Sequence, residues 1–434
     1  MAMTMGGEPQ ANVAGSESAP ASVRWFVFLL FFLFGGITSL NDILIPKLKH
    51  LFVLSWTEAM LIQFVFFAAY FLVSIPAAAL LRRLGYMRTA AAGLLTMMAA
   101  CLLFIPASGS GLFVAFLAAL FVLGAGITTV QVVANPLISM LGRAETSHSR
   151  LTFAQAFNSL GTTIFPFVGA RLILGGLADT DPATLAPSDR AAFLAAETQA
   201  VVHAYLGIAA LLFLVAAAIW TSRNILAEAE KGGGNARPSF GLLRQPRFAL
   251  GTLGIFVYVG AEVAIASLLT NYLMDRRTLG IDAQAAGEML VFYWGGAMIG
   301  RFLGAGLLRV VSPPLVLLGA ALCAAGLVTL SILSSGQLAG YALLAVGLCN
   351  AIMFPTIFSL ACEGLGERRA DASGIICMAI VGGAIVPLLT GALADGVGLG
   401  GALLLPIACY AIIAAFARFC SVRPASFEGD NGNA

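Results

Sequence analysis

The sequence has little charge and no basic runs. Only 10% of its 434 residues are charged, against about 25% in soluble domains. Hydrophobic residues make up 60% of the chain, and the mean hydropathy is +0.95. This composition excludes a soluble domain and predicts a polytopic membrane protein. No run of Lys or Arg exceeds two residues, so the sequence gives no support to a nucleic-acid partner.

Clustered cysteines, abundant histidine and nucleotide-binding loops are also lacking. The seven cysteines fall almost entirely in apolar stretches without CxxC spacing, which predicts buried thiols instead of disulfides or metal ligands. Three histidines at the edges of these stretches do not favour a zinc or catalytic centre. No P-loop, nucleophile elbow or HExxH motif is present. We therefore expect no enzyme, no ATP hydrolysis, no metal and no cofactor.

The apolar stretches are long enough to span a bilayer. There are twelve of them. They cover residues 25–46, 57–81, 89–107, 111–141, 150–175, 200–222, 247–274, 285–308, 314–335, 337–363, 371–395 and 400–421.

Lysine and arginine placement predicts the orientation of these spans, because cytoplasmic loops carry the excess. With both termini cytoplasmic, 17 of the 23 basic residues, Arg301 among them, fall on the cytoplasmic side. The six on the outer side are Lys47, Lys49, Arg171, Arg190, Arg276 and Arg277.

A polar, Gly-rich stretch divides the spans into two sets of six. The sequence predicts an all-α membrane protein with twelve transmembrane helices in two pseudo-symmetric bundles. The expected parts are a disordered cytoplasmic tail at 1–23, a six-helix bundle at 24–222, a cytoplasmic linker at 223–246, a second bundle at 247–421 and a cytoplasmic tail at 422–434.

Two segments of the first half resemble segments of the second half, which supports an internal repeat. Aligning Pro136 with Pro355 places Gln131 opposite Asn350, and residues 159–172 echo residues 380–393. Transporters are commonly built from such repeats, with the substrate at the repeat interface.

The motif GGITSLNDILIP at 35–46 places a carboxylate, Asp42, in a helix that begins with ten apolar residues. At the bilayer centre an acidic residue costs about 2.5–3.5 kcal/mol on insertion scales, so it is expected to face a bundle interior or a watery cavity. Asp42 is predicted to be a working residue of a membrane transporter. The alternative is that it marks the outer end of the helix.

Polar residues in the first half form stripes at helical spacing, so each pair shares one face. Together they suit a ligand rich in hydroxyl groups. The alternative is that these amides cross-link helices, at about 0.6 kcal/mol per bond. The candidates are Asn41 beside Asp42, Gln63 with Tyr70, Gln131 with Asn135, and Gln155 with Asn158.

In the second half, Glu262 is predicted to be the deepest carboxylate, near mid-membrane. It is a candidate for coupling, for substrate binding or for a structural contact. Trp294 is expected mid-helix, either as a platform for a sugar face or as ordinary packing. Asn350 is a further candidate substrate ligand.

The segments SLNDILIP, AMLIQFVFFAAYF, QVVANP, RLTFAQAFNSLGT, FYWGGAMIGRF and NAIMFPTIFSL resemble the fucose permease-like branch of the major facilitator superfamily. Within it, the sequence is most similar to bacterial glucose/galactose transporters, in register from about residue 25 to 420. The resemblance implies alternating access and cation-coupled import of a monosaccharide across the inner membrane by a monomer.

The resemblance also implies roles for individual residues. Asp42 matches the aspartate that serves proton coupling in the fucose permease, whereas Gln131 stands where that protein has a second coupling carboxylate. Gln155 and Asn158 match residues that contact the sugar. The loop LRRLGYMR lacks the usual aspartate of the superfamily, so gating contacts at this loop are not implied.

The sequence thus predicts a hexose:proton symporter for glucose or galactose. Its proposed coupling groups are Asp42 and Glu262. Sodium coupling, an uncoupled facilitator, a sugar sensor, and transport of fucose, mannose or N-acetylglucosamine remain alternatives.

Overall fold

The structure, a computed structural model, describes residues 21–52, 54, 56–169, 187–221, 223–224 and 240–423. Within these ranges, the side chains of Asn41 and Asp42 lie outside the described part. Both tails and most of the linker also lie outside it, so the predicted domain boundaries stay predictions.

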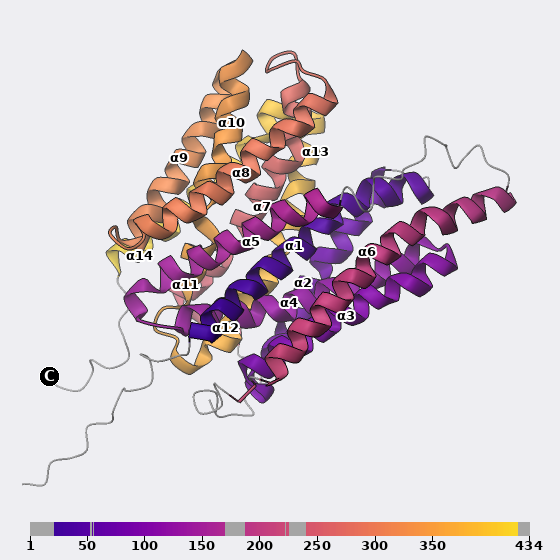
Figure 1. The fold of residues 1–434 in the computed structure, drawn as a ribbon. Coiled ribbons are helices and arrows are strands. Elements are labelled where there is room, and N and C mark those ends of the chain that lie inside the picture. Colours follow the sequence, from indigo (N-terminus) through magenta and orange to yellow (C-terminus); the bar gives the residue numbers. More distant parts are fainter. Residues whose placement is uncertain are drawn as a thin grey trace, which may run out of the picture.

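All regular structure in the described residues is helical, as a chain in lipid requires, since a helix satisfies its own backbone hydrogen bonds. In the first half, α3 packs against α4 and α6, α1 against α5, and α2 against α4 (Figure 1). The helices are α1 (Ala21–Phe52), α2 (Trp56–Leu84), α3 (Tyr86–Ser110), α4 (Phe113–Met140), α5 (Ser147–Gly169) and α6 (Pro187–Thr221).

The second half packs in the same manner, with α7 against α13 and α14, and α9 against α10 and α14. Its helices are α7 (Pro246–Met274), α8 (Ala283–Leu307), α9 (Pro313–Leu333), α10 (Gly336–Asn350), α11 (Met353–Cys362), α12 (Arg369–Ala379), α13 (Gly382–Ala402) and α14 (Leu404–Val422). Short 3₁₀ turns occupy Ala144–Thr146, Phe240–Arg244 and Gly366–Arg368.

Two spans expected to be continuous are broken. The span predicted at 337–363 consists of α10 and α11, and the span predicted at 371–395 consists of α12 and α13. Pro355 explains the first break, because proline lacks an N–H and its ring clashes with the carbonyl four residues earlier, here that of Ala351. Taking α10–α11 and α12–α13 as one span each, the described helices form the twelve expected spans.

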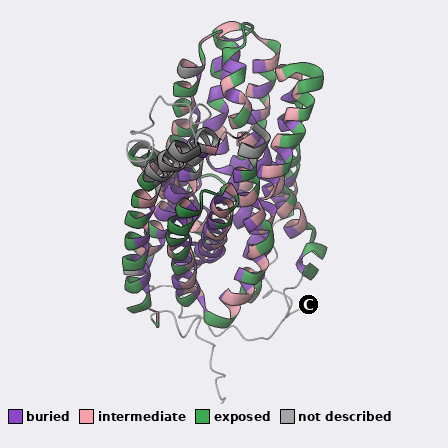
Figure 2. Cartoon of the chain, turned by 90° about the vertical axis from the view of Figure 1, so that its right-hand side faces the viewer, coloured by how far each residue is buried: buried purple, intermediate pink, exposed green. Residues whose placement is uncertain are grey.

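The described helices are suited to a membrane. Eleven segments of the described chain are long and apolar enough to cross a bilayer. The twelfth span, α5, carries His148, Arg150, Gln155 and Asn158 and therefore has a lower hydropathy. Buried residues face the interior of each half and exposed residues face outward (Figure 2). Because the outward faces are largely apolar, the chain is a multi-pass membrane protein.

The two halves repeat the same close helix contact. A Cβ on Gly161 of α5 would lie 2.1 Å from the carbonyl oxygen of Phe32 on α1, and a Cβ on Gly382 would lie 2.0 Å from that of Phe256 on α7. These glycines occupy equivalent positions in the echo of 159–172 with 380–393. The repeat seen in the sequence is therefore a repeat of packing, and only glycine allows the backbones to approach so closely.

Candidate functional site

A cavity of about 150 Å³ lies between the two halves. We call it the central cavity. The first half contributes Phe34, Gly35, Thr38, Tyr70, Gln131, Gln155, Asn158 and Thr162, and the second half contributes Tyr258, Val259, Glu262, Arg301, Phe354 and Ile380. Its polar lining comes from six helices, which converge only in the folded chain.

On the first-half side, amide groups are held by neighbouring helices. The Tyr70 hydroxyl on α2 donates a hydrogen bond of 2.9 Å to Oε1 of Gln131 on α4. Nδ2 of Asn158 donates to the carbonyl of Phe31 on α1, at 3.3 Å. Gln155 is buried beside them on α5. Each amide keeps hydrogen-bonding capacity that can serve a ligand hydroxyl.

On the second-half side, tyrosines hold the carboxylate of Glu262. The Tyr258 hydroxyl donates to Oε1 of Glu262 at 2.8 Å. The Tyr293 hydroxyl donates to the backbone carbonyl of Glu262 at 3.2 Å and accepts from Nδ2 of Asn350 at 2.9 Å. Tyr410 donates to Oδ1 of Asn350 at 2.8 Å. A connected network of hydrogen bonds fixes the position of its members.

The repeat of packing also locates Glu262. Since Gly161 contacts Phe32 as Gly382 contacts Phe256, Glu262 occupies in α7 the register that Thr38 occupies in α1. Both residues line the central cavity. The carboxylate is therefore the second-half counterpart of a cavity hydroxyl.

Arg301 was counted by charge placement among the cytoplasmic basic residues, and this assignment is wrong. It lies within α8 and lines the central cavity. Its guanidinium bonds to the Ser159 hydroxyl and to the carbonyl of Gln155, the latter at 3.3 Å, so it joins α8 to α5 of the other half. It also interacts electrostatically with Glu262. The sequence feature that could have identified Arg301 as a site residue is its charge within an otherwise apolar helix.

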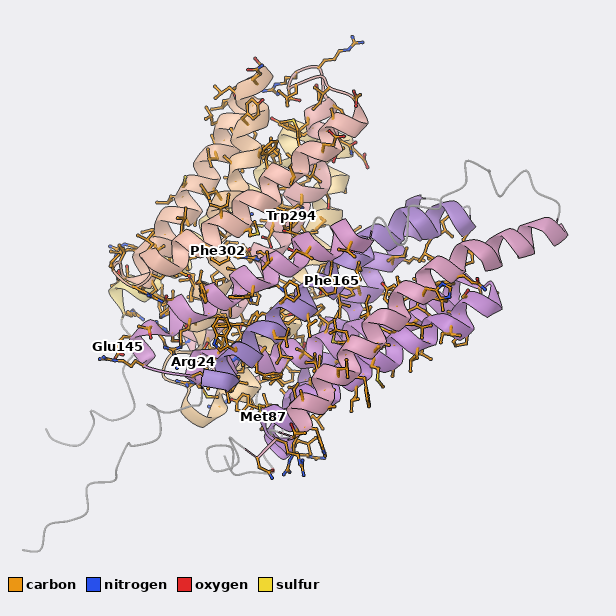
Figure 3. All side chains as sticks on the ribbon, viewed as in Figure 1. Arg24, Met87, Glu145, Phe165, Trp294 and Phe302 are labelled. Atoms are coloured by element: carbon orange, nitrogen blue, oxygen red, sulfur yellow. The ribbon has the colours of Figure 1, made fainter. Side chains whose placement is uncertain are left out.

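A larger cavity of about 500 Å³ adjoins the central cavity and shares Thr38, Tyr70 and Ile380 with it. We call it the aromatic cavity. It is lined by Gln63 and by the rings of Phe66, Phe67 and Trp294. In Figure 3, Trp294 lies on α8 away from Arg24, Met87 and Glu145. Those three mark the end of the molecule that also carries Arg82, Arg143 and Arg369, which we call the arginine-rich end.

The structure brings most, but not all, of the predicted site residues together. Gln131, Gln155, Asn158 and Glu262 line the central cavity, and Gln63 and Trp294 line the aromatic cavity. Asn350 and Asn135 are fully buried and line neither cavity. Asn350 instead supports the tyrosines around Glu262, and Asn135 lies beside Cys377. The side chains of Asn41 and Asp42 lie outside the described part.

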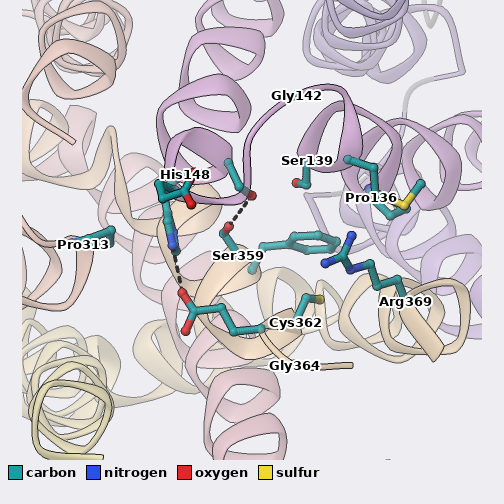
Figure 4. Close-up of a pocket in the computed structure, with 14 residues that line it drawn as sticks. Pro136, Ser139, Gly142, His148, Pro313, Ser359, Cys362, Gly364 and Arg369 are labelled. Atoms are coloured by element: carbon teal, nitrogen blue, oxygen red, sulfur yellow. Dashed lines mark hydrogen bonds and ion pairs between the residues drawn. The ribbon is translucent and has the colours of Figure 1, made fainter. Parts of the chain in front are cut away.

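At the arginine-rich end, side chains bond the two halves to one another. Arg82 on α2 forms an ion pair with Asp371 on α12. Nε2 of His148 on α5 lies 2.9 Å from Oε1 of Glu363, which also pairs with Arg247 of α7. The Ser147 and Ser359 hydroxyls lie 3.1 Å apart; the bonds of His148 and Ser359 are dashed in Figure 4. No motif or spacing in the sequence indicates these pairings.

Comparison with known proteins gives consistent matches. The model of the family described as Major Facilitator Superfamily matches residues 27–380. The chain is 47% identical over 393 residues to a glucose/galactose transporter of Brucella abortus, covering 89% of this chain and 91% of that one. It is 34% identical over 408 residues to an L-fucose-proton symporter of Escherichia coli, with 90% and 91% covered.

The solved structures include a similar fold. The crystal structure of the MFS transporter FucP in the outward conformation matches with a TM-score of 0.82 and 32% identity, covering 92% of this chain and 98% of that one.

Proposed function

This chain belongs to the Major Facilitator Superfamily and is a sugar transporter of that type, and on this premise we propose that it imports glucose or galactose by proton symport. One observation carries the proposal: amides and hydroxyls from one half face a carboxylate and an arginine from the other across a single cavity. Such groups match the alternating donors and acceptors of a sugar.

The proposed transport cycle is based on the contacts that close one end of the molecule. In the described state the halves are bonded at the arginine-rich end, while the aromatic cavity lies towards the other end. We propose that the arginine-rich end is cytoplasmic, that the sugar enters through the aromatic cavity, and that this occurs in the inner membrane of the cell. Both halves of the chain line the central cavity, and we propose a monomer as the transporting unit.

Asp42 is proposed as the proton-coupling group, and Glu262 as a second one. Asp42 follows Thr38, a residue of both cavities, by one helical turn. Similarity to an L-fucose-proton symporter supports a proton over sodium. Gln131, Gln155 and Asn158 are proposed sugar ligands, with Asn41, Gln63, Asn135, Trp294 and Asn350 completing or supporting the site.

The proposal is tested by uptake of labelled D-glucose into proteoliposomes under an inward proton gradient without sodium. The wild type is expected to accumulate the sugar transiently above equilibrium, whereas Asp42→Asn only equilibrates it. Asp395→Asn, at an exposed position of α13, is the matched control. Accumulation that requires sodium, or that persists in Asp42→Asn, contradicts the proposed coupling.

A further inference from the structure

We propose that a second cavity, at the arginine-rich end, is an exit-side binding site for the transported hexose. It has a volume of about 520 Å³, within the range of about 300–1,000 Å³ typical of small-molecule sites. Ser139, Ser147 and Ser359 line it (Figure 4), and we call it the serine cavity. This inference rests on the proposed function, because it takes a hexose to be the cargo.

The lining of the serine cavity has the chemistry of a sugar site. Three hydroxyls, the imidazole of His148 and the carboxylate of Glu363 offer both donors and acceptors. The His148 side chain is only 7% exposed, and its Nδ1 has no hydrogen-bond partner among the described residues. Buried polar atoms are nearly always paired, so this nitrogen is available for a further hydrogen bond. A sugar hydroxyl would provide the partner.

The groups that would bind the sugar now bond the two halves to each other. Ser147 and His148 come from α5, whereas their partners Ser359 and Glu363 come from the second half. When the halves separate at this end, as alternating access requires, each of these groups loses its partner. Hydroxyls of a hexose in the cavity can replace those partners, which lowers the free-energy cost of opening. Glu363 remains held by Arg247 in either case.

The serine cavity also lies next to the central cavity. Phe354 lines the central cavity and Phe358, one turn further along α11, lines the serine cavity. Their rings are stacked with centroids 6.3 Å apart. On α4, Gln131 lines the central cavity and Ser139, two turns later, lines the serine cavity. A movement of α11, which the break before Met353 separates from α10, would connect the two sites.

Ser139→Leu tests the site, because it fills the serine cavity without removing a bond between the halves. Among the described residues, the Ser139 hydroxyl bonds only to the Asn135 carbonyl of its own helix, at 2.9 Å. Thr221→Leu is the matched control, since that exposed hydroxyl bonds to the Ala218 carbonyl of its own helix, at 2.7 Å. Ser139→Ala is a milder second variant that keeps the helix and removes only the hydroxyl.

The measurement is the half-saturating concentration of D-glucose on each side of right-side-out membrane vesicles. Efflux from preloaded vesicles gives the internal value, and influx gives the external value. Ser139→Leu is expected to raise the ratio of internal to external values about fivefold, the effect of roughly one lost hydrogen bond, and Thr221→Leu to leave it unchanged. An unchanged ratio in both Ser139 variants overturns the proposal.

Alkylation of Cys362, which lines the serine cavity, gives an independent readout in the unaltered protein. In inside-out vesicles, D-glucose but not L-glucose is expected to slow modification of this thiol by a maleimide, as followed by peptide mass spectrometry. Equal rates with both sugars contradict the exit-side site. If the wild type moves no hexose at all, the proposed function itself fails. If the wild type transports hexose and the ratio is unaltered in both Ser139 variants, only the exit-side site fails.

Discussion

The Tyr70 hydroxyl donates a 2.9 Å hydrogen bond to Oε1 of Gln131, and so joins α2 to α4 at the wall of the central cavity. Removing the donor in Tyr70→Phe leaves a buried amide oxygen without its partner, at a cost of about 1–3 kcal/mol. We expect the KM for D-glucose uptake to rise about tenfold. Tyr341→Phe, at an exposed position of α10, should leave it unchanged. An unaltered KM in Tyr70→Phe would show that Gln131 does not need this orientation.

Glu262→Gln separates the roles considered for this residue. The glutamine keeps an oxygen that can accept from Tyr258, so the tyrosine network should survive, but it cannot exchange a proton. We expect gradient-driven accumulation to be lost while exchange of labelled for unlabelled D-glucose continues. Glu288→Gln, exposed on α8, is the control. Full accumulation with a raised KM would instead identify Glu262 as a sugar ligand.

Arg301→Lys keeps the positive charge but not the planar fork of donors. Nη1 of Arg301 donates to the Ser159 hydroxyl and the Gln155 carbonyl of α5, while its Nε donates to the Ala351 carbonyl of the second half, at 3.4 Å. A single ammonium cannot reproduce both arms of this fork. We expect the initial rate of D-glucose uptake to fall about tenfold, the effect of one or two lost hydrogen bonds. Arg276→Lys, in an exposed loop, serves as the control. A wild-type rate in Arg301→Lys would mean that charge alone is needed.

Asp371→Asn breaks the ion pair with Arg82 that links the halves. Arg82 is partly exposed and Asp371 is buried, so neutralising Asp371 weakens this contact. The arginine-rich end should then open more often and Cys362 should be alkylated faster. The double variant Arg82→Asp, Asp371→Arg is expected to restore slow alkylation. Arg143→Gln breaks an exposed pair with Glu145 and should have no effect. A slow rate in Asp371→Asn would exclude this pair as a closing contact.

Much of the fold was predictable because the bilayer constrains it strongly. The length and hydropathy of the apolar stretches gave the number of spans and most boundaries to within a few residues. The spacing of Gln155 and Asn158 placed both on one face of α5, and both line the central cavity. Charge counting failed at Arg301, because the rule for loops was applied to a residue that lies inside a helix.

Other features of the site depend on contacts between residues that are far apart in the sequence. Glu262 was predicted as a coupling group and Asn350 as a substrate ligand, but only the structure joins them through Tyr293 and Tyr258. Likewise, the sequence places His148 just before the span predicted at 150–175, whereas the structure makes it a contact between the halves.

The sequence by itself determined the class of protein, the number of spans, the internal repeat and the helix faces that carry polar groups, because these depend on composition and on spacing along one helix. Only the tertiary structure decided which faces meet, that Arg301 reaches α5, and that one end is closed by Arg82 with Asp371 and by His148 with Glu363. The physical reason is that such contacts depend on packing between helices, and packing is set by the shapes of both partners at once.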